Sequence, residues 1–384
     1  MSTHLDRESG PFSDLPAALV DDVIGQCHAA GATVLGALQS TFRDRDSLRS
    51  KLEQSGLVRQ DLSLPEVTAP TTCATDGSYS VERLLTVDLA VGAAVAVEGL
   101  TPPSELRHWE APWHVCFVEA EQHNEKTGNM VRAAMLGEEL KLATKAPHQL
   151  VLLDCTLTLP VIYFNQALTG LSQARNSKSA KRFVENLHDY LEAYVRVLLP
   201  RRSDQDFVGV PKYSTRSEIV GQLGLEGIHD DRGLLSLILR PGEYTTPMDL
   251  QSPDEPWHMA VEKAGASHEI RDLNTSALEA IKTLQVVYYR PRNWLPAMRL
   301  EMSRQIAQQP SRLGSVLKGI QMQSAAASMF EPYPLYLADR TVKSLAHAVP
   351  TLRQVMAQSM AETYEGEIGD VYLALHGYRS ENGR

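Results

Sequence analysis

A short apolar run at residues 150–153, Leu-Val-Leu-Leu, ends directly in an acid, Asp154. Four aliphatic residues in a row, without the alternation of a half-exposed strand, are typical of a strand that is buried on both faces. The preceding segment, residues 129–146, is rich in Ala, Leu, Met, Glu and Lys and predicts a helix that Pro147 stops. Helix and strand patterns mix in this way along the chain, so we predict an α/β fold.

A second acid, Asp76, follows another strand-like run, in the stretch TCATDGSYSV at residues 72–81. The Asp-Gly pair is a common hairpin signal, and the next apolar run, residues 84–99, also has the pattern of a strand. We therefore expect Asp76 to lie at a strand end that faces a tight reversal of the chain. A surface turn without chemistry is the simpler interpretation, and a functional one requires other acids to meet it.

The remaining patterns predict further helices and strands. Apolar residues at helical spacing predict two amphipathic helices within residues 14–56, and another helical pattern covers residues 176–199. Strand patterns cover residues 113–119 and the start of 206–218, and residues 284–303 have the pattern of a β-hairpin. We therefore divide the chain into an N-terminal helical segment (residues 1–60), a central α/β domain (residues 70–350) and a C-terminal helix and tail (residues 351–384).

The composition favours a globular protein of the cytoplasm. A hydrophobic fraction of 43% over 384 residues can supply a sizeable core. No run approaches the roughly 18 apolar residues that span a bilayer, and the first residues lack the basic-then-apolar order of a secretory signal. We therefore expect no membrane association. The four cysteines lie far apart without a C-x-x-C pair, which argues against a zinc site and against a disulfide framework.

The formal net charge of −10 argues against a surface that wraps nucleic acid, because binding phosphates requires a local excess of Lys and Arg. Any contact with DNA must therefore be local. Most basic clusters are simply solvated surface. The candidate clusters contain Lys178, Lys181, Arg182, Arg201, Arg202, Lys212 and Arg216.

The sequence lacks the common motifs of several enzyme classes. It has no G-x-x-x-x-G-K-[ST] loop for nucleotide hydrolysis and no G-x-G-x-x-G after a strand for a dinucleotide. It also has no H-E-x-x-H and no G-x-S-x-G, which removes the simplest protease and hydrolase interpretations. What remains as a source of chemistry is a set of carboxylates.

These acids could form a metal site if the strands that carry them are neighbours. Asp76 and Asp154 end predicted strands, Glu138 and Glu139 lie on the helix before the second strand, and Asp339 lies in the first turns of a late helix. Mg²⁺ and Mn²⁺ prefer oxygen ligands and can activate water for phosphodiester cleavage. Each acid also has a simpler interpretation, because helix glutamates are usually solvated and an acid near a helix start matches the helix dipole.

The order of several short motifs resembles that of the NurA nuclease family. The resemblance covers roughly residues 70–345 and implies an RNase H-like core, with a mixed sheet flanked by helices, in the central domain. It also implies a homodimer that works with a HerA-type hexameric ATPase as a Mn²⁺-dependent exonuclease and endonuclease, in DNA end resection and repair or in antiviral defence against phages. The motifs, in chain order, are DGS, LVLLDCTL, FVGVPKYS, DDRGLLSLILRPGE, VVYYR, MRLEMS and YPLYLADR.

The resemblance assigns metal-binding roles to individual residues. Asp76 matches the first ligand of the family, and Asp154 matches the acid of its buried strand. Glu139 matches the acid on the helix, with Glu138 as the alternative, and Asp339 matches the closing ligand. These residues are expected to hold Mn²⁺ or Mg²⁺.

Other positions complete the expected site. Glu301 matches a further acid of the family and is included among the expected catalytic residues, while Lys212, and with it Arg216, is expected to contact DNA phosphates. One departure concerns the residues after Asp154, where this chain has Cys155-Thr156 and the family favours Gly-Ser. If that glycine has a positive φ, Cys155 would be strained in its place.

Three functional hypotheses follow, of which a metal-dependent DNA nuclease leads. The alternative is a catalytically inactive NurA-like adaptor that docks on the ATPase ring and regulates it, and the Cys155-Thr156 turn is its main support. The retained acids argue against the adaptor, because a crowded anionic cleft costs stability without serving it. An unrelated α/β enzyme would require the order of the motifs to be a coincidence.

Overall fold

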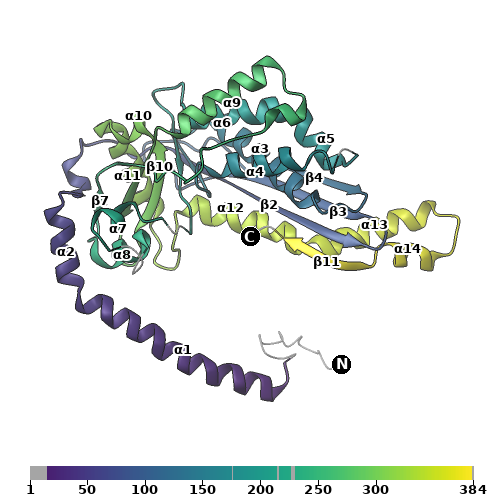
Figure 1. Ribbon diagram of the computed structural model, residues 1–384, viewed down its shortest axis with the longest axis horizontal. Helices are drawn as coiled ribbons and strands as arrows, with labels where there is room; N and C mark the ends of the chain where they lie inside the picture. The colour runs from purple at the N-terminus through teal and green to yellow at the C-terminus, as the bar shows by residue number, and fades with distance from the viewer. Residues whose placement is uncertain (1–14, 175, 214–215, 226–229, 383–384) are drawn as a thin grey trace. The chain divides into compact units, whose positions relative to one another are not determined.

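The computed structural model describes residues 15–174, 176–213, 216–225 and 230–382 (Figure 1). The chain separates into two compact units, of which the first ends at Ser55 and the second begins at Gly56. The first unit contains α1 (Ala17–Arg43) and α2 (Arg45–Gln54), which confirm the two helices predicted there. The second unit contains the sheet and the predicted carboxylate site.

The second unit is built on a mixed sheet that has eleven strands within the described residues. The main path runs in the order β1-β7-β9-β10-β6-β5-β2-β3-β4, while β11 pairs with β2 and β8 pairs with β9. β5 is parallel to β2 and to β6, and the other pairs are antiparallel. The strands are β1 (Val58–Gln60), β2 (Thr72–Leu84), β3 (Asp88–Glu98), β4 (Trp113–Glu121), β5 (Leu150–Leu153), β6 (Asp206–Gly209), β7 (Glu243–Thr245), β8 (Met248–Asp249), β9 (Leu284–Arg290), β10 (Met298–Ser303) and β11 (Gly377–Asn382).

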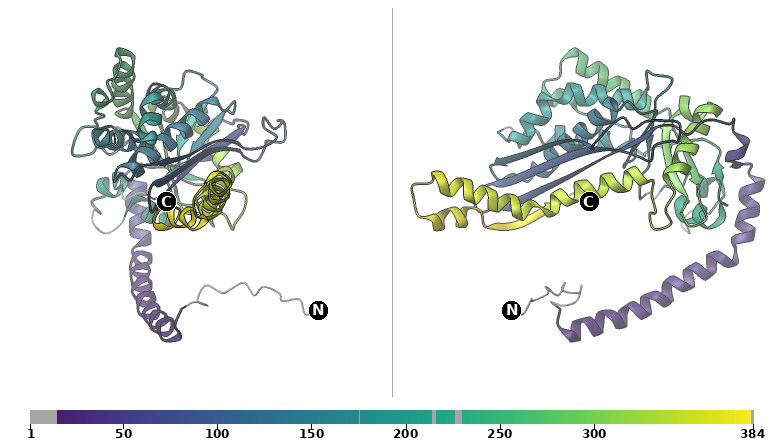
Figure 2. Two further views of the ribbon diagram at one scale, coloured as in Figure 1. Left: turned by 90° about the vertical axis from the view of Figure 1, so that its right-hand side faces the viewer. Right: turned by 180° about the vertical axis from the view of Figure 1, so that it is seen from behind.

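Helices cover both faces of this sheet (Figures 1 and 2). One face carries α3 (Thr127–Lys145), α4 (Leu159–Gly170), α5 (Lys178–Glu185), α6 (Leu187–Leu198) and α9 (His268–Ile281), and the other carries α10 (Arg304–Ala307), α11 (Pro310–Gln323) and α12 (Tyr333–His347). The remaining elements are α7 (Glu218–Gln222), α8 (Asp231–Ile238), α13 (Val349–Thr363), α14 (Ile368–Ala374) and the short 3-10 helices η1 (Asp61–Ser63) and η2 (Val261–Ala264).

Two separate cores lie on the two faces, because successive strand side chains point in opposite directions. On β2, Cys73 packs in the core under α3, whereas Ala74 packs in the core under α11 and α12. On β5, Val151 and Leu153 share the first core, and Leu152 lies in the second. β5 is therefore buried on both faces, as its unbroken apolar run predicts.

The structure corrects three expectations. Asp76 lies inside the 13-residue strand β2 and not at a strand end, and the reversal of the chain falls at residues 85–87, where the Leu84 N–H donates to the Val87 carbonyl. The helical pattern over residues 176–199 forms two helices, because α5 ends at Glu185 and α6 begins at Leu187. The Asp76-Gly77 pair, which was expected to form a turn, lies within β2.

The boundaries of the units also differ from the expected ones. β1, which the sequence placed in the N-terminal segment, pairs with β7 in the second unit. Residues 351–384 belong to the same unit, and β11 within them pairs with β2. The hairpin of β9 and β10 and strand β4 confirm their sequence patterns. Within the described part of the chain, no helix has the length and apolar character that crossing a membrane requires.

Candidate active site

Asp76 and Asp154 lie side by side because their strands are parallel neighbours. Thr75 of β2 pairs with Leu153 of β5, and the Asp154 N–H donates to the Thr75 carbonyl at 3.3 Å. Asp76 directly follows Thr75, and Asp154 directly follows Leu153, so the two acids are also neighbours. By the alternation of strand side chains, both acids face the side of the sheet that α11 and α12 cover.

Asp339 approaches the same point from α12, which packs against β2 and β3. One carboxylate oxygen from each of Asp76, Asp154 and Asp339 lies within 4.8 Å of the other two. We call this group the carboxylate cluster. It joins three elements that are separated by up to 263 residues of sequence, from residue 76 to residue 339.

Glu139 approaches from the other face of the sheet, where β5 has ended. Its side chain on α3 is buried, and the Thr75 hydroxyl donates to its Oε1 at 3.4 Å. The neighbouring Glu138 points elsewhere, because its Oε1 accepts a hydrogen bond from the Tyr190 hydroxyl at 2.9 Å. Of the two glutamates that the sequence left open, the structure brings Glu139 next to the carboxylate cluster.

The surroundings of Asp76, Glu139 and Asp154 raise the pKa values of these acids and so favour their protonated forms. Burial raises the pKa of Asp76 well above its ordinary value, and the charges of Asp154 and Glu139 raise it further. Burial and the charge of Asp154 raise the pKa of Glu139 to about 8. Burial also raises the pKa of Asp154, to about 7, although Lys212 opposes this. Burial and the neighbouring negative charges thus outweigh the positive charge near these acids, and a bound cation would favour their ionised forms.

Lys212 is the cation that the protein itself supplies. It follows β6, and its Nζ lies 2.7 Å from Asp154 Oδ2, 2.7 Å from Asp339 Oδ1 and 3.2 Å from Glu331 Oε2. Burial lowers the pKa of Lys212, but these carboxylates outweigh that effect and raise it. The pKa of Asp339 is lowered in spite of its burial, by hydrogen bonds from Lys212 and Lys343. Lys212 and Lys343 therefore compensate Asp154 and Asp339, while burial still raises the pKa of Asp76 and of Asp154.

Glu301 does not join the carboxylate cluster. Its Oε2 accepts hydrogen bonds from Thr156 Oγ1 at 2.6 Å and from the Leu157 N–H at 2.9 Å, and its Oε1 accepts one from Arg299 Nε at 2.7 Å. Arg299 is fully buried and also forms two hydrogen bonds with Glu218, both at 2.8 Å. Glu301, which resembled a catalytic acid, thus holds the turn that follows Asp154.

The turn after Asp154 is not strained in the way that the sequence suggested. Among the residues that the structure describes, none other than glycine has a positive φ, so Cys155 adopts an ordinary backbone conformation. The space for this turn comes from Gly209, which pairs with Leu153 in the neighbouring strand. A Cβ on Gly209 would lie 2.7 Å from the Cys155 carbonyl oxygen. Glycine is therefore required in β6, next to the turn, and not within it.

The other basic residues considered as DNA contacts, among them Arg216, Arg182 and Arg202, have different surroundings from Lys212. Arg216 is half-buried at the start of the α7 region, and its carbonyl accepts a hydrogen bond from the Asp231 N–H. Arg182 pairs with Glu119 at 2.8 Å, and Arg202 pairs with Asp204 at 2.7 Å. Only Lys212 among the proposed phosphate contacts is in direct contact with the carboxylate cluster, within the described residues.

Sequence reasoning missed two parts of the site. Glu331 precedes α12 and contacts Lys212, but an acid in the Pro-rich approach to a helix has no distinguishing sequence signal. Arg299 lies two residues before Glu301 on β10, on the same face of the strand, so an Arg and a Glu at this spacing in an otherwise largely apolar strand were the available signal for an ion pair.

The residues present suit a divalent metal ion. The donors are carboxylate oxygens, which Mn²⁺ and Mg²⁺ prefer, and the three of the carboxylate cluster are close enough to share one ion. Burial raises the pKa values of Asp76, Asp154 and Glu139, and a cation bound at this point would lower them. Asp76, Asp154 and Asp339 would hold the ion, and Glu139 adds a further negative charge that acts on Asp76.

Comparison with known proteins finds a similar fold in solved structures of nucleases. No protein-family model and no curated protein matches the sequence. Among solved structures, the NurA nuclease from Sulfolobus solfataricus matches with a TM-score of 0.59 at 11% identity, over 92% of this chain and 100% of that one. A NurA structure with manganese matches with a TM-score of 0.54 at 14% identity, over 89% of this chain and 99% of that one.

A further match is a NurA structure bound to dAMP and manganese, with a TM-score of 0.50 at 13% identity, over 90% of this chain and 99% of that one. At these identities the similarity concerns the fold. It confirms the mixed sheet flanked by helices that the motif order implied. This chain therefore has the RNase H-like fold of the NurA nucleases over nearly its whole length.

Proposed function

We propose that this chain is a metal-dependent DNA nuclease that hydrolyses phosphodiester bonds. The observation that carries the proposal is the convergence of three carboxylate oxygens within 4.8 Å, at a point where burial and mutual repulsion raise the pKa values of Asp76 and Asp154. Such an arrangement costs stability in the absence of a cation and serves no structural purpose. The similarity in fold to a NurA nuclease structure supports the proposal.

The reaction adds water across one phosphodiester. The water oxygen forms a bond to phosphorus, the bond from phosphorus to the leaving oxygen breaks, and that oxygen takes up a proton. A bound Mn²⁺ or Mg²⁺ lowers the pKa of a water molecule and stabilises the charge of the leaving oxygen. Asp76, Asp154 and Asp339 would hold the ion, and the carboxylate of Glu139, in the ionised form that a nearby cation favours, can accept a proton from water.

Lys212 has a second role in this proposal. Its ammonium group contacts Asp154 and Asp339 directly, so a DNA phosphate that approaches the cluster also approaches Lys212. The positive charge then attracts the phosphate and offsets part of the negative potential of the acids. Lys212 is therefore the proposed phosphate contact next to the reacting bond, whereas Arg216 is proposed to contact DNA farther from it.

The test is cleavage of labelled linear duplex and single-stranded DNA with Mn²⁺, Mg²⁺ or EDTA. The wild type is compared with Asp76→Ala and Asp154→Ala, and an exposed acid outside the site, Asp254, supplies the control variant Asp254→Ala. Metal-dependent cutting by the wild type and the control, lost in both site variants, supports the proposal. Cutting that survives in either site variant contradicts it.

We also propose that a HerA-type hexameric ATPase delivers DNA to a homodimer of this chain in end processing or defence against phages. The chain has no P-loop of its own and carries a net charge of −10, so an external motor would supply both energy and a path for the DNA. Co-purification with the ATPase and ATP-dependent stimulation of cleavage test the partnership. Sedimentation of the chain alone tests the dimer.

The adaptor hypothesis has lost its main support. It depended on strain at Cys155, and no described residue other than glycine has the backbone conformation that would cause it. The acids of the metal site lie together, which an adaptor would not require.

A further inference from the structure

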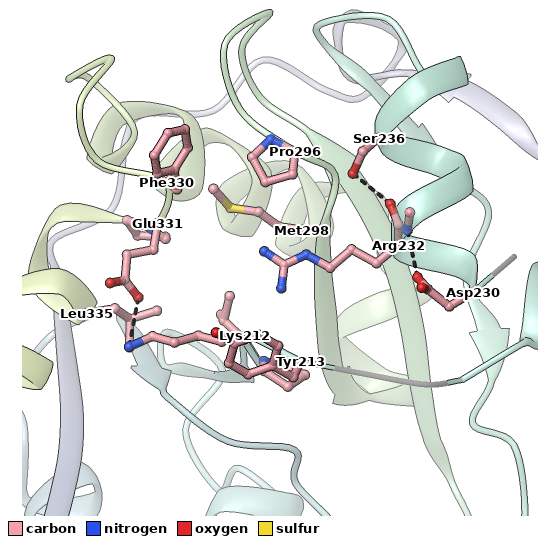
Figure 3. Close-up of a pocket in the computed structure, with 14 residues that line it drawn as sticks. Lys212, Tyr213, Asp230, Arg232, Ser236, Pro296, Met298, Phe330, Glu331 and Leu335 are labelled. Carbon is pink, nitrogen blue, oxygen red and sulfur yellow. Dashed lines mark hydrogen bonds and ion pairs between the residues drawn. The ribbon is translucent and has the colours of Figure 1, made fainter. Parts of the chain in front are cut away.

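We propose that a cavity beside the carboxylate cluster receives one unpaired nucleotide of the DNA strand, with its base against Phe330 and Met298 and a phosphate on Arg232. This inference rests on the proposed nuclease function and adds a preference for unpaired DNA to it. The cavity has a volume of about 520 Å³ (Figure 3). Pockets for small organic ligands of nucleotide size fall in the range of about 300–1,000 Å³.

The cavity adjoins the proposed metal site. Lys212 lines it and also contacts Asp154 and Asp339 of the carboxylate cluster. Glu331 lines it as well and pairs with Lys212 at 3.2 Å. A phosphodiester at the cluster would therefore have its neighbouring nucleotide within reach of the cavity, which places the cavity on the path of the strand.

Arg232 gives the cavity a cationic group that has no direct hydrogen-bond or ion-pair partner among the described residues. Figure 3 shows its guanidinium extending from α8 toward the middle of the cavity, between Met298 and Lys212. Within the described residues, no hydrogen bond or ion pair engages that guanidinium; only the backbone carbonyl of Arg232 accepts one, from Ser236 Oγ at 2.6 Å. The nearby Asp230 is occupied in capping α8 through the Gly233 N–H. The charges of Asp230 and Glu331 act on Arg232 without a direct ion pair, so its half-buried guanidinium keeps donors that can bind the oxygens of a phosphate group.

The apolar side chains that line the cavity can pack against the flat face of a nucleobase. Phe330 is 65% exposed, so one side of its ring is available for contact. Met298, Pro296 and Leu335 supply the remaining apolar lining. Nucleobases stack on aromatic side chains when they are unpaired, and each stacked base contributes roughly 5- to 150-fold in affinity. A base in a duplex keeps its stacking partners and cannot enter, so the cavity favours single-stranded ends.

The test measures binding without cleavage. A fluorescein-labelled eight-residue oligodeoxynucleotide is titrated with the protein in Ca²⁺ at about 50 mM salt, because phosphate contacts weaken at high salt. Fluorescence anisotropy gives the dissociation constant, and a gel verifies that the oligonucleotide stays intact. A series of oligonucleotides carries one abasic site at each position in turn.

We expect one abasic position to weaken binding to the wild type at least fivefold, in line with the contribution of a stacked base. The same abasic site should change binding to Phe330→Ala less than twofold, because the base has already lost its contact. Phe330→Trp should restore the sensitivity. Tyr372 on α14 is 66% exposed and does not line the cavity, so Tyr372→Ala should behave as the wild type.

Arg232 is tested with the same probe. Arg232→Gln should weaken binding about tenfold for intact and abasic oligonucleotides alike, since it removes a phosphate contact. Arg240, which is exposed beyond the end of α8, supplies the matched control Arg240→Gln.

The outcomes separate this inference from the proposed function. Three results overturn the nucleotide cavity even if the protein cuts DNA with Mn²⁺. The dissociation constant does not depend on the abasic position, or an abasic site weakens binding to the wild type and to Phe330→Ala equally, or the oligonucleotide does not bind. Base-sensitive binding that disappears in Phe330→Ala supports the cavity even if no cleavage is found, in which case the nuclease proposal fails alone.

Discussion

The carboxylate of Glu301 accepts a 2.6 Å hydrogen bond from the hydroxyl of Thr156, which lies 145 residues earlier in the chain. Glu301 stands in the same row of the sheet as Leu153, because Glu301 pairs with Gly209 and Gly209 pairs with Leu153. A strand two positions away thereby fixes the turn that follows Asp154. The position of Asp154 in the carboxylate cluster thus depends on a residue that does not belong to the cluster.

Replacing Glu301 by Gln should reduce both stability and cleavage. The change leaves the buried guanidinium of Arg299 with Glu218 as its remaining carboxylate partner, and breaking a buried ion pair costs about 3 kcal/mol. Cleavage should fall about tenfold, because Asp154 loses its fixed orientation. Urea unfolding and initial cleavage rates measure the two effects. Glu279→Gln, at an exposed pair with Lys282, should change stability by less than about 0.5 kcal/mol.

Replacing Asp76 by Asn should have opposite effects on stability and activity. The substitution removes one of the mutually repelling charges, so the unfolding free energy of the metal-free protein should rise by about 1 kcal/mol. Cleavage should fall at least about 1,000-fold, since a metal ligand is lost. Thermal unfolding in EDTA measures the first effect. If Asp76→Asn had a lower melting temperature in EDTA than the wild type, Asp76 would stabilise the metal-free protein, and repulsion among the acids would not be the dominant effect.

The stability of the metal-free protein should fall as the pH rises from about 4 to about 8. Unfolded Asp and Glu titrate near pH 4, whereas the folded protein has a pKa of about 7 for Asp154 and about 8 for Glu139. Between these values the folded state holds protons that the unfolded state releases, so raising the pH favours unfolding. Chemical unfolding in EDTA across this range measures the slope, and Glu139→Gln should reduce it.

Mn²⁺ affinity should rise over the upper part of the same pH window. The metal must displace the protons that Asp154 and Glu139 retain, so binding releases protons below about pH 8. Calorimetric titration at about pH 6 and pH 8, in two buffers of different ionisation enthalpy, measures the affinity and the proton release. An affinity that is independent of pH would contradict the raised pKa values.

Replacing Lys212 by Met should destabilise the metal-free protein by about 1–2 kcal/mol, because its partly exposed ammonium group compensates Asp154 and Asp339. Mn²⁺ should recover much of this loss by supplying the missing charge. Lys343→Met is the control, since Lys343 pairs with Asp339 and not with Asp154 among the described residues, and its side chain is 52% exposed. A loss of stability that Mn²⁺ leaves unchanged would place the role of Lys212 outside the metal site.

Replacing Gly209 by Ala should lower cleavage more than tenfold, although it removes none of the proposed metal ligands. The added Cβ would lie 2.7 Å from the Cys155 carbonyl oxygen, so the turn after Asp154 must shift. Gly25→Ala is the control, because a Cβ there meets nothing within 4 Å and Ala favours a helix. Cleavage rates and melting temperatures of both variants measure the effect.

The sequence by itself determined the class of fold and the main acids. The unbroken apolar run of Leu150–Leu153 required a strand covered on both faces, and an acid directly after it had to find compensation. The order of the short motifs indicated the fold and selected Asp76, Asp154 and Asp339, which the structure brings within 4.8 Å. These signals are local, so they could be read without knowing which strands are neighbours.

Only the tertiary structure decided the roles of the remaining residues. Glu138 and Glu139 are adjacent in sequence, and helix packing alone turns one toward Tyr190 and the other toward Asp154. The pairing of β10 with β6 places Glu301 beneath a turn and away from the cluster. Side-chain direction depends on sheet register and on the face that a helix buries, and both result from contacts between distant segments, which no local pattern records.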